Sequence, residues 1–512
     1  VMPVLDSLQP RDFVPLQPGT PLFYIVSVRT SLESTDPKAA AMADWIAAYN
    51  VPQTLYSSHI QAWANLWKSG MEFEGRVDVA RVVNSSLYYL LSSVRDDAVY
   101  SLSPGGLASN GYNGHTFWDC ETWMYPTLVL WHPDIAASLL QYRIDRVDGA
   151  REKAKSYKKN YTGAMFPWES AATGVETCPT WAATGQLEQH ITGDIAFAVQ
   201  QFWYATYNVT WLRKAYPPLL QETANFWVSR VNISGDQAHI QNVIPPDEDN
   251  KGDDSVYTNF VGRRNLLFAA EAASVLGAKA DPHWKNVANK IPILFDAQQG
   301  IHPEFQGYRG QNIKQADVVL LGFPLMMNMT AAVRKADLEY YAARTNKNGP
   351  AMTWGMHAIG FIELGDIAQA ASHFNRSFAN AQEPFLVWTE TPTGGAVNFL
   401  TGVGGFLQTA MFGLSGLRIW DSYLALKPSL IEGMTSITLR GLHYQGSVFD
   451  FSWDQRRMCL SISAGTDLTL TDEQGQETRV VAGKSVTLPC GAVRVKASEN
   501  IALPLQSTSF VI

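Results

Sequence analysis

Residues 194–207 read DIAFAVQQFWYATY, and this stretch carries the spacing that decides the fold. Apolar residues return every three or four positions, at Ile195, Val199 and Phe202, which is the spacing of one apolar helix face. The same spacing recurs in LLQETANFWVSRV (219–231), RNLLFAAEAASVLGA (264–278) and LEYYAART (338–345). Such segments follow one another from about residue 36 to about residue 418, and they predict a large body of packed helices.

After about residue 420 the spacing changes to an alternation of apolar and polar residues. The segments SVFDFSW, RMCLSIS, TDLTLTD, KSVTLPC and AVRVKAS show it, separated by Gly, Asp and Asn turns. The chain is therefore predicted to be mainly α with a C-terminal antiparallel β domain. Residues 1–36 are rich in proline and contain one strand-like run, LFYIVSVRT at 22–30, so we expect a linker there.

The loops between the helices are rich in acidic and aromatic residues. Five of them stand out: 109–126, 163–190, 243–259, 307–315 and 384–402. An α-solenoid spreads its loops along a groove, whereas a closed toroid of inner and outer helices gathers them at one mouth. The clustering of this chemistry in five separated loops favours the toroid.

Composition excludes several classes of function. The net charge is −8, and no basic run exceeds KSYKK at 155–159, so nucleic acid and anionic membranes are not expected as partners. No apolar stretch approaches the roughly 20 residues that span a bilayer. The 16 Trp residues suit a large core, and they equally suit stacking against sugar rings.

Two residue types bear on the compartment. Of the four cysteines, Cys459 and Cys490 either pair with each other or are free thiols. N-x-S/T sequons begin at six positions, and their number weakly favours a secretory, lysosomal or vacuolar location over a cytoplasmic one. They begin at Asn84, Asn160, Asn208, Asn232, Asn328 and Asn375.

The segment HTFWDCETWMYP (115–126) places two carboxylates, Asp119 and Glu121, in an apolar run. A buried carboxylate needs hydrogen-bond partners, because without them its burial costs several kcal/mol. We therefore expect Asp119 to face a polar group of the protein or a ligand. Glu121 is expected to be a structural partner of a nearby helix or backbone group.

The loop VIPPDEDNKGDDSVYTN (243–259) is the most acidic of the five. It does not fit the EF-hand template, because Lys251 and Thr258 fall on positions that require oxygen ligands and a bidentate Glu. It is then either a solvated acidic loop or the site of an acid. The like-charged neighbours of Glu248 would raise its pKa, as a group that protonates a leaving group requires.

The segment EPFLVWTETPTGGAVNFLTGVGGF (383–406) places Glu390 near Trp388 and before a glycine-rich stretch. Alone, Glu390 is an ordinary exposed residue. Together with Glu248 it forms the carboxylate pair that glycoside hydrolysis needs, and only a closed fold would bring two such distant residues together.

Other chemistries have weaker support. The sequence has no G-x-S-x-G elbow, Walker loop, H-E-x-x-H or dinucleotide fingerprint. His190 and Asp194 lack a third metal ligand, so a structural pair is favoured. Lys314 and Gln315 look like a polar pair at a helix start. No metal or cofactor is expected.

Six motifs in this order carry a family resemblance: TFWDCETWMYP, FPWESA, HITGDIAFA, PPDEDN with SVYTN, KQADVVLLGFP and WTETPTGGAVNFLTGVGGFLQ. Between about residues 58 and 418 the chain resembles glycoside hydrolase family 65. The resemblance implies an (α/α)6 barrel followed by a β-sandwich, which cleaves an α-linked glucose with inversion. The implied domains are a linker or N-terminal β-sandwich remnant (1–36), the barrel (37–419) and a C-terminal β-sandwich (420–512).

The resemblance also implies roles for particular residues. Glu248 would be the general acid and Glu390 the general base. The substrate-binding residues would be Trp118, Asp119, Trp168, Glu169, Lys314 and Gln315. One departure lies beside the acid, where Asp249 stands in place of the tyrosine usual in the family.

The function implied by the resemblance is release of the α-1,2-linked glucose from glucosyl-galactosyl-hydroxylysine in collagen-type proteins. An acid trehalase or a disaccharide phosphorylase of the same family remains open, as does a non-enzymatic carbohydrate-binding protein. Glu390 favours water over phosphate, because a phosphorylase replaces the base with phosphate. The oligomeric state is left open.

Overall fold

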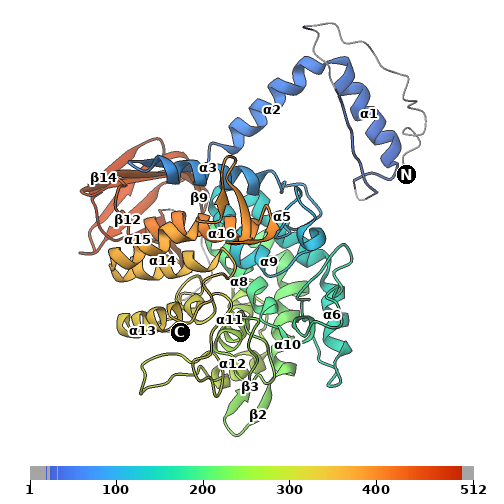
Figure 1. The fold of residues 1–512 in the computed structure, drawn as a ribbon, viewed down its shortest axis with the longest axis vertical. Helices are drawn as coiled ribbons and strands as arrows, with labels where there is room; N and C mark the ends of the chain where they lie inside the picture. Colours follow the sequence, from blue (N-terminus) through green and yellow to red (C-terminus); the bar gives the residue numbers. More distant parts are fainter. Residues whose placement is uncertain (1–18, 20–23, 32, 499–512) are drawn as a thin grey trace. The chain divides into compact units, whose positions relative to one another are not determined.

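The computed structural model describes residues 19, 24–31 and 33–498. The chain divides into two compact units, Val1–Trp67 and Lys68–Ile512. Figure 1 shows the helices and strands along the chain. The α-helices of the described residues are α1 (Pro37–Asn50), α2 (Pro52–Leu66), α3 (Val77–Leu91), α4 (Tyr125–Trp131), α5 (Pro133–Asp145), α6 (Val147–Ser156), α7 (Thr184–Leu187), α8 (Ile191–Thr206), α9 (Val209–Ala215), α10 (Glu222–Arg230), α11 (Val256–Val275), α12 (Pro282–Lys290), α13 (Ala331–Ala342), α14 (Thr353–Leu364), α15 (Ile367–Ser377) and α16 (Leu400–Gln408).

The first unit contains α1 and α2. Helix α1 begins at Pro37 because the Asp36 carboxylate accepts the Ala39 N–H at 2.9 Å, which satisfies a free donor of the first turn. The strand-like run at 22–30 forms no strand in the part that the structure describes, residues 24–30. A strand needs a neighbouring strand to accept its backbone hydrogen bonds, and these residues have none there.

The helices of the second unit differ in how many of their residues are buried. Helices α8, α11, α14 and α16 bury nearly all of their residues, whereas α12, α13 and α15 bury only one face. The four periodic segments of the sequence correspond to α8, α10, α11 and α13. The prediction of a mainly helical chain with C-terminal strands is confirmed.

The C-terminal strands, drawn orange to red in Figure 1, form two antiparallel five-stranded sheets together with one strand from earlier in the chain. One has the order β1 (Gly70–Glu74), β9 (Ser436–Tyr444), β10 (Ser447–Asp454), β11 (Arg457–Gly465) and β14 (Ser485–Pro489). The other has the order β13 (Glu477–Val480), β12 (Leu468–Asp472), β15 (Val493–Ala497), β8 (Leu424–Leu426) and β7 (Arg418–Ile419). β1 comes from the segment before α3, and Met71 lies opposite Leu439 of β9.

Two segments expected as loops contain regular structure. After Asp119 the chain forms a π-helical turn (η3, Cys120–Met124) that continues into α4. The 384–402 segment holds β5 (Val387–Thr391) and β6 (Gly394–Val397), which pair with β4 (Ala381–Gln382) in a small sheet. A second hairpin joins β2 (Asn232–Ser234) to β3 (Gln237–His239). The expected loops are thus rigid elements that can hold side chains in fixed positions.

Cys459 and Cys490 are both free, so the thiol alternative holds for this pair. Among the described residues, no helix is both long enough and apolar enough to cross a membrane.

Candidate active site

Asp119 lies at the start of the π-helical turn η3, where the chain turns into the helical body. It is half-buried, and its Oδ1 accepts a hydrogen bond of 2.6 Å from the Thr401 hydroxyl at the start of α16. Burial raises the pKa of Asp119 to about 7; the Thr401 bond opposes this, and the charges of Glu248 and Glu390 add to it. Both proposed catalytic carboxylates therefore lie within electrostatic reach of Asp119.

Glu248 occupies a strained turn. Its backbone φ is +64°, a left-handed conformation that L-residues rarely adopt, and its N–H bonds the Pro245 carbonyl at 3.0 Å. The half-buried carboxylate receives the Lys314 ammonium, with Nζ 2.5 Å from Oε2. Such strain persists only where the surroundings fix the backbone, and it is frequent at functional sites.

Lys314 and Gln315 come from the segment that packs against this turn. Burial alone would lower the pKa of Lys314, but the Glu248 carboxylate outweighs it and the pKa is raised, so the ammonium is charged. The Gln315 amide is buried and donates to the Pro246 carbonyl at 2.6 Å. In this structure the pair thus contacts the Glu248 turn.

Glu390 lies in β5, and both of its carboxylate oxygens accept hydrogen bonds. Its Oε1 accepts the Tyr112 hydroxyl at 2.8 Å, and its Oε2 accepts the Ala396 N–H of β6 at 2.9 Å. A Cβ atom at Gly395 would lie 2.8 Å from Oε2, so only glycine leaves room for this carboxylate. The hairpin therefore fixes the direction of Glu390.

Tyr112 is a site residue that the sequence analysis missed. Tyr112 and Asn113 both have positive φ, 58° and 53°, which is unusual for two consecutive non-glycine residues. The Tyr112 ring packs edge-on against Phe117. Burial, followed by the charges of Glu390, Asp119 and Glu248, raises its pKa, so its hydroxyl stays a donor. The left-handed pair gives no periodic signal in the sequence.

Trp168 and Glu169 contact the rings of two residues that precede Asp119 in the chain. The Trp168 ring lies edge-on to Phe117 at 5.0 Å, and the Glu169 carboxylate bonds His115 Nδ1 at 2.7 Å. Trp168 is half-buried and Glu169 is buried.

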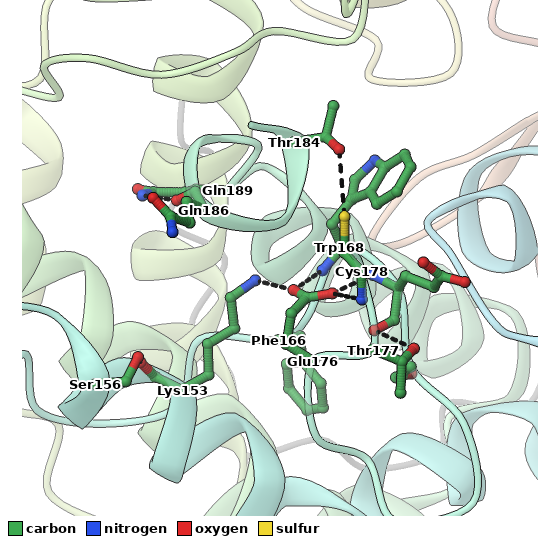
Figure 2. A network of polar contacts seen from close by, with 12 residues as sticks. Lys153, Ser156, Phe166, Trp168, Glu176, Thr177, Cys178, Thr184, Gln186 and Gln189 are labelled. Atoms are coloured by element: carbon green, nitrogen blue, oxygen red, sulfur yellow. Dashed lines mark hydrogen bonds and ion pairs between the residues drawn. The ribbon is translucent and has the colours of Figure 1, made fainter. Parts of the chain in front are cut away.

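A partly buried ion pair between Lys153 and Glu176 holds the backbone of these two residues (Figure 2). Glu176 Oε2 accepts the Lys153 ammonium at 2.5 Å and the Trp168 N–H at 2.9 Å, while Oε1 accepts the N–H groups of Glu169 and Cys178. Burial lowers the pKa of Lys153, and Glu176 opposes this. The network anchors the Trp168–Glu169 segment to α6.

Trp118 is buried and contacts a second polar cluster. Its ring meets the His190 ring edge-on at 4.8 Å, and His190 bonds Asp194 through Nδ1 at 2.6 Å and Glu188 through Nε2 at 3.1 Å. The favoured prediction of a structural His190–Asp194 pair agrees with this geometry. Glu188, which the sequence did not single out, is buried; burial and then the Glu248 charge raise its pKa to about 8.

Glu121 has the structural role that we expected. Its two carboxylate oxygens accept Arg143 Nε at 2.7 Å and Nη2 at 2.9 Å, and both side chains are buried. In the described residues, no group of three or more His, Cys, Asp or Glu side chains is arranged to hold a metal ion.

The site can thus combine two carboxylates, a cation and rigid hydrogen-bond donors. Comparisons with known proteins agree with this chemistry. Residues 84–312 match the glycosyl hydrolase family 65 central catalytic domain. The chain is 49% identical over 441 residues to a protein-glucosylgalactosylhydroxylysine glucosidase of Dictyostelium discoideum. The matched region covers 84% of this chain and 62% of that protein.

A Danio rerio protein of the same name is 41% identical over 461 residues, covering 85% of this chain and 70% of the relative. The chain thus spans about two thirds of the lengths of these curated relatives. A solved human-microbiome protein, named as a candidate kojibiose phosphorylase, has a TM-score of 0.77 at 16% identity. This likeness covers 89% of this chain and 68% of the solved chain, and it concerns the fold alone.

Proposed function

Because the chain belongs to glycoside hydrolase family 65, we propose that it is an inverting glycosidase that releases α-linked glucose. The helices of the second unit, up to residue 419, would close as an (α/α)6 barrel, followed by a β-sandwich over 420–512. The proposal rests on one observation above all: the fold holds two carboxylates from distant parts of the chain in place, Glu248 by the Lys314 ammonium and Glu390 by the Tyr112 hydroxyl and the Ala396 N–H.

Glu248 is the general acid of this proposal and protonates the glycosidic oxygen as the bond breaks. The Lys314 ammonium pairs with the Glu248 carboxylate in the free protein. A sugar hydroxyl that bonds Lys314 would weaken this pairing and leave the Glu248 carboxyl group free to face the glycosidic oxygen.

Glu390 is the general base and takes a proton from the water that attacks the opposite face of the sugar. For such a water to fit, the two carboxyl groups should be about 6.5–9.5 Å apart. Asp119 would accept hydrogen bonds from the glucose hydroxyls. The other residues of the proposed glucose pocket are Trp118, Trp168, Glu169, Lys314 and Gln315.

The substrate that we propose is the glucose α-1,2-linked to galactosyl-hydroxylysine in collagen-type proteins. Its support is the name shared by the two curated relatives. An acid trehalase would use the same glucose pocket with a different acceptor. A phosphorylase is disfavoured, because phosphate would have to approach the carboxylate of Glu390, which the hairpin holds in place.

The test is turnover of defined substrates. Glucosyl-galactosyl-hydroxylysine, kojibiose and trehalose are each incubated with the protein, with and without phosphate, and glucose and glucose-1-phosphate are measured. We expect glucose from the first substrate, released as the β-anomer in early NMR spectra. The α-anomer first would exclude inversion, and glucose-1-phosphate would support a phosphorylase.

Variants separate an enzyme from a binding protein. Glu248→Gln and Glu390→Gln should each abolish turnover, since each lacks a proton-transfer group. A wild-type protein that binds these sugars without consuming any of them, and a Glu248→Gln variant that binds them equally well, would favour the carbohydrate-binding alternative.

We also propose that the protein passes through the secretory pathway, with a cytoplasmic location as the alternative. The support is that the asparagine of every one of the six sequons is exposed. Treatment of the protein from its native source with an N-glycan endoglycosidase should lower its apparent mass, and an unchanged mass would favour the cytoplasm.

A further inference from the structure

Three fully buried carboxyl groups lie behind the Glu248 turn and have no role in the mechanism above. Asp247 precedes Glu248, Asp317 follows Gln315, and Glu304 lies in the segment after α12. The relative exposures of the three residues are all 0%. In the described part of the chain, no ion pair joins any of them to a Lys or Arg side chain.

Hydrogen bonds from these groups join the two segments that carry the proposed acid and Lys314. Asp317 Oδ2 accepts the Asp247 N–H at 3.0 Å, and Asp247 Oδ1 accepts the Lys314 N–H. Asn250 then donates to Asp247 Oδ2 at 2.5 Å and to the Asn312 carbonyl at 3.1 Å. The two segments are therefore fixed to each other on both sides of Asp247.

Three oxygens of the cluster meet no donor within the described residues: both of Glu304 and Oδ1 of Asp317. Buried ionised carboxylates cannot be left without donors, and the charges of Asp317 and Asp247 oppose the ionisation of Glu304. A proton shared among the groups resolves both problems, because a protonated carboxyl donates an O–H to its neighbour. Burial raises the pKa of Asp247 to about 6, that of Asp317 to about 8, and that of Glu304 well above its ordinary value.

The groups around the cluster do not replace this proton. Asp249 adds negative charge toward Asp247. The charges of Asp317 or Glu304 act on three nearby phenols, but the hydroxyls of these phenols donate to other groups: Tyr257 to Asp194, Tyr308 to the Gln311 carbonyl and Tyr341 to the His302 carbonyl. The charge of His190 lowers the pKa of Asp317, but His190 is itself bonded to Asp194 and Glu188.

We propose that Asp247, Glu304 and Asp317 are positioning residues, a proton-sharing carboxyl cluster that holds Glu248 and Lys314 in one rigid frame. The assignment rests on the proposed role of Glu248 as the acid. It explains how the left-handed backbone of Glu248 is maintained, since the residue before it is fixed through both its N–H and its side chain.

Sharing of the proton is tested with Glu304→Gln, whose amide donates where a protonated carboxyl would. Thermal unfolding is measured from pH 5 to pH 9. Wild-type protein must keep the proton as the pH rises and should lose stability, whereas Glu304→Gln should lose less. The exposed Glu339→Gln is the control and should follow the wild type. Parallel curves for the wild type and Glu304→Gln would overturn the proposal.

Positioning is tested at Asp317. Asp317→Leu removes the acceptor of the Asp247 N–H and should lower kcat for glucose release roughly 100-fold with little change in KM, because small displacements of catalytic groups have effects of that size. Asp317→Asn keeps an acceptor oxygen, so its kcat should be at least about 10-fold higher than that of Asp317→Leu.

Asp337→Leu is the matched control. Asp337 is also buried, and its carboxylate accepts the His302 N–H at 2.8 Å and bonds His302 Nδ1 at 2.8 Å. Its folded fraction should keep its kcat. Equal losses of kcat in the two leucine variants would overturn the positioning role. If instead Glu248→Gln stays active, the proposed acid fails, while the melting test of Glu304 is unaffected because it needs no turnover.

Discussion

Among single residues, Tyr112 has the most specific contact with the proposed base, a hydroxyl hydrogen bond of 2.8 Å to Glu390. A hydrogen bond to a charged group contributes about 2 kcal/mol, which corresponds to roughly 30-fold in rate. We therefore expect Tyr112→Phe to lower kcat by about that factor. The loss is measured as the rate of glucose release at saturating substrate.

Tyr89→Phe is the matched control for this substitution. The Tyr89 hydroxyl bonds the Phe385 carbonyl at 2.7 Å, close to the same hairpin but away from the carboxylate. Its removal should leave kcat unchanged. The same loss of kcat in both variants would mean that Tyr112 acts through the general packing of the hairpin.

At the scale of elements, the β5–β6 hairpin places Glu390, and Gly395 is its tightest point. In Gly395→Ala the new Cβ would lie 2.8 Å from both Cβ and Oε2 of Glu390. We expect kcat to fall roughly 100-fold, since the carboxylate must move. Gly365 has a similar φ of +74° with open space around it. Gly365→Ala should therefore reduce stability by about 1 kcal/mol and leave kcat unchanged, measured on the folded protein.

The α6 network in Figure 2 gives a second prediction at this scale. Glu176→Ala leaves Lys153 buried without its partner and frees the N–H groups of Trp168 and Glu169. Removing one partner of a buried pair costs about 3 kcal/mol or more. We expect lower stability and a higher KM, because the proposed glucose-pocket segment loses its anchor.

Two further variants separate charge from anchoring in this network. Lys153→Met combined with Glu176→Ala removes the unpaired charge, so it should recover stability without recovering KM. The exposed Glu152→Ala on the same helix should change neither quantity. A double variant that recovers KM as well would show that the backbone anchors are unimportant.

Across the whole molecule, the sequence predicts what depends on local pattern. The 3.6-residue spacing located α8 and α11, and the alternation located the C-terminal strands, because one apolar face repeats along each element. Contacts between distant segments leave no such pattern. Tyr112 meets Glu390, and β1 pairs with β9, only after the chain has folded.

The contacts within the carboxyl cluster could not be predicted from the sequence either. PPDEDN and KQAD were noticed as separate motifs, and Lys314 was expected to contact substrate. That Asp247 bonds the Lys314 backbone, with Asp317 behind it, could not be read from either motif. Local spacing reports the face of an element, whereas the support of a site comes from the packing of several elements.

The buried carboxyl groups together predict how stability depends on pH. Burial raises the pKa of Asp247 to about 6, of Asp119 and Glu271 to about 7, and of Glu188 and Asp317 to about 8. Each group binds a proton more tightly in the folded state than in the unfolded state. Its stabilising contribution is complete below its ordinary pKa near 4 and is lost as the pH rises through the folded value.

The histidines include groups with a raised pKa and groups with a lowered pKa, so their contributions to stability change with pH in opposite directions. His190 has a pKa raised to about 10 despite its burial, mainly by Asp194, so its contribution is lost from about pH 6.5 upward. Burial lowers the pKa of His132 and His373 to about 4, so their contribution is complete above about pH 6.5 and is lost toward pH 4.

Above about pH 6.5 the carboxyl groups and His190 therefore both lower the free energy of unfolding as the pH rises. His132 and His373, whose pKa values are lowered, no longer oppose this change. We expect the free energy of unfolding to fall between pH 6.5 and pH 8.5, as measured by chemical denaturation at each pH. The fall should persist at high salt, because buried groups are screened weakly. Glu271→Gln, away from the site, should reduce the slope without changing its sign. A free energy of unfolding that rises over this range would contradict the assignment of these carboxyl groups as protonated in the folded state.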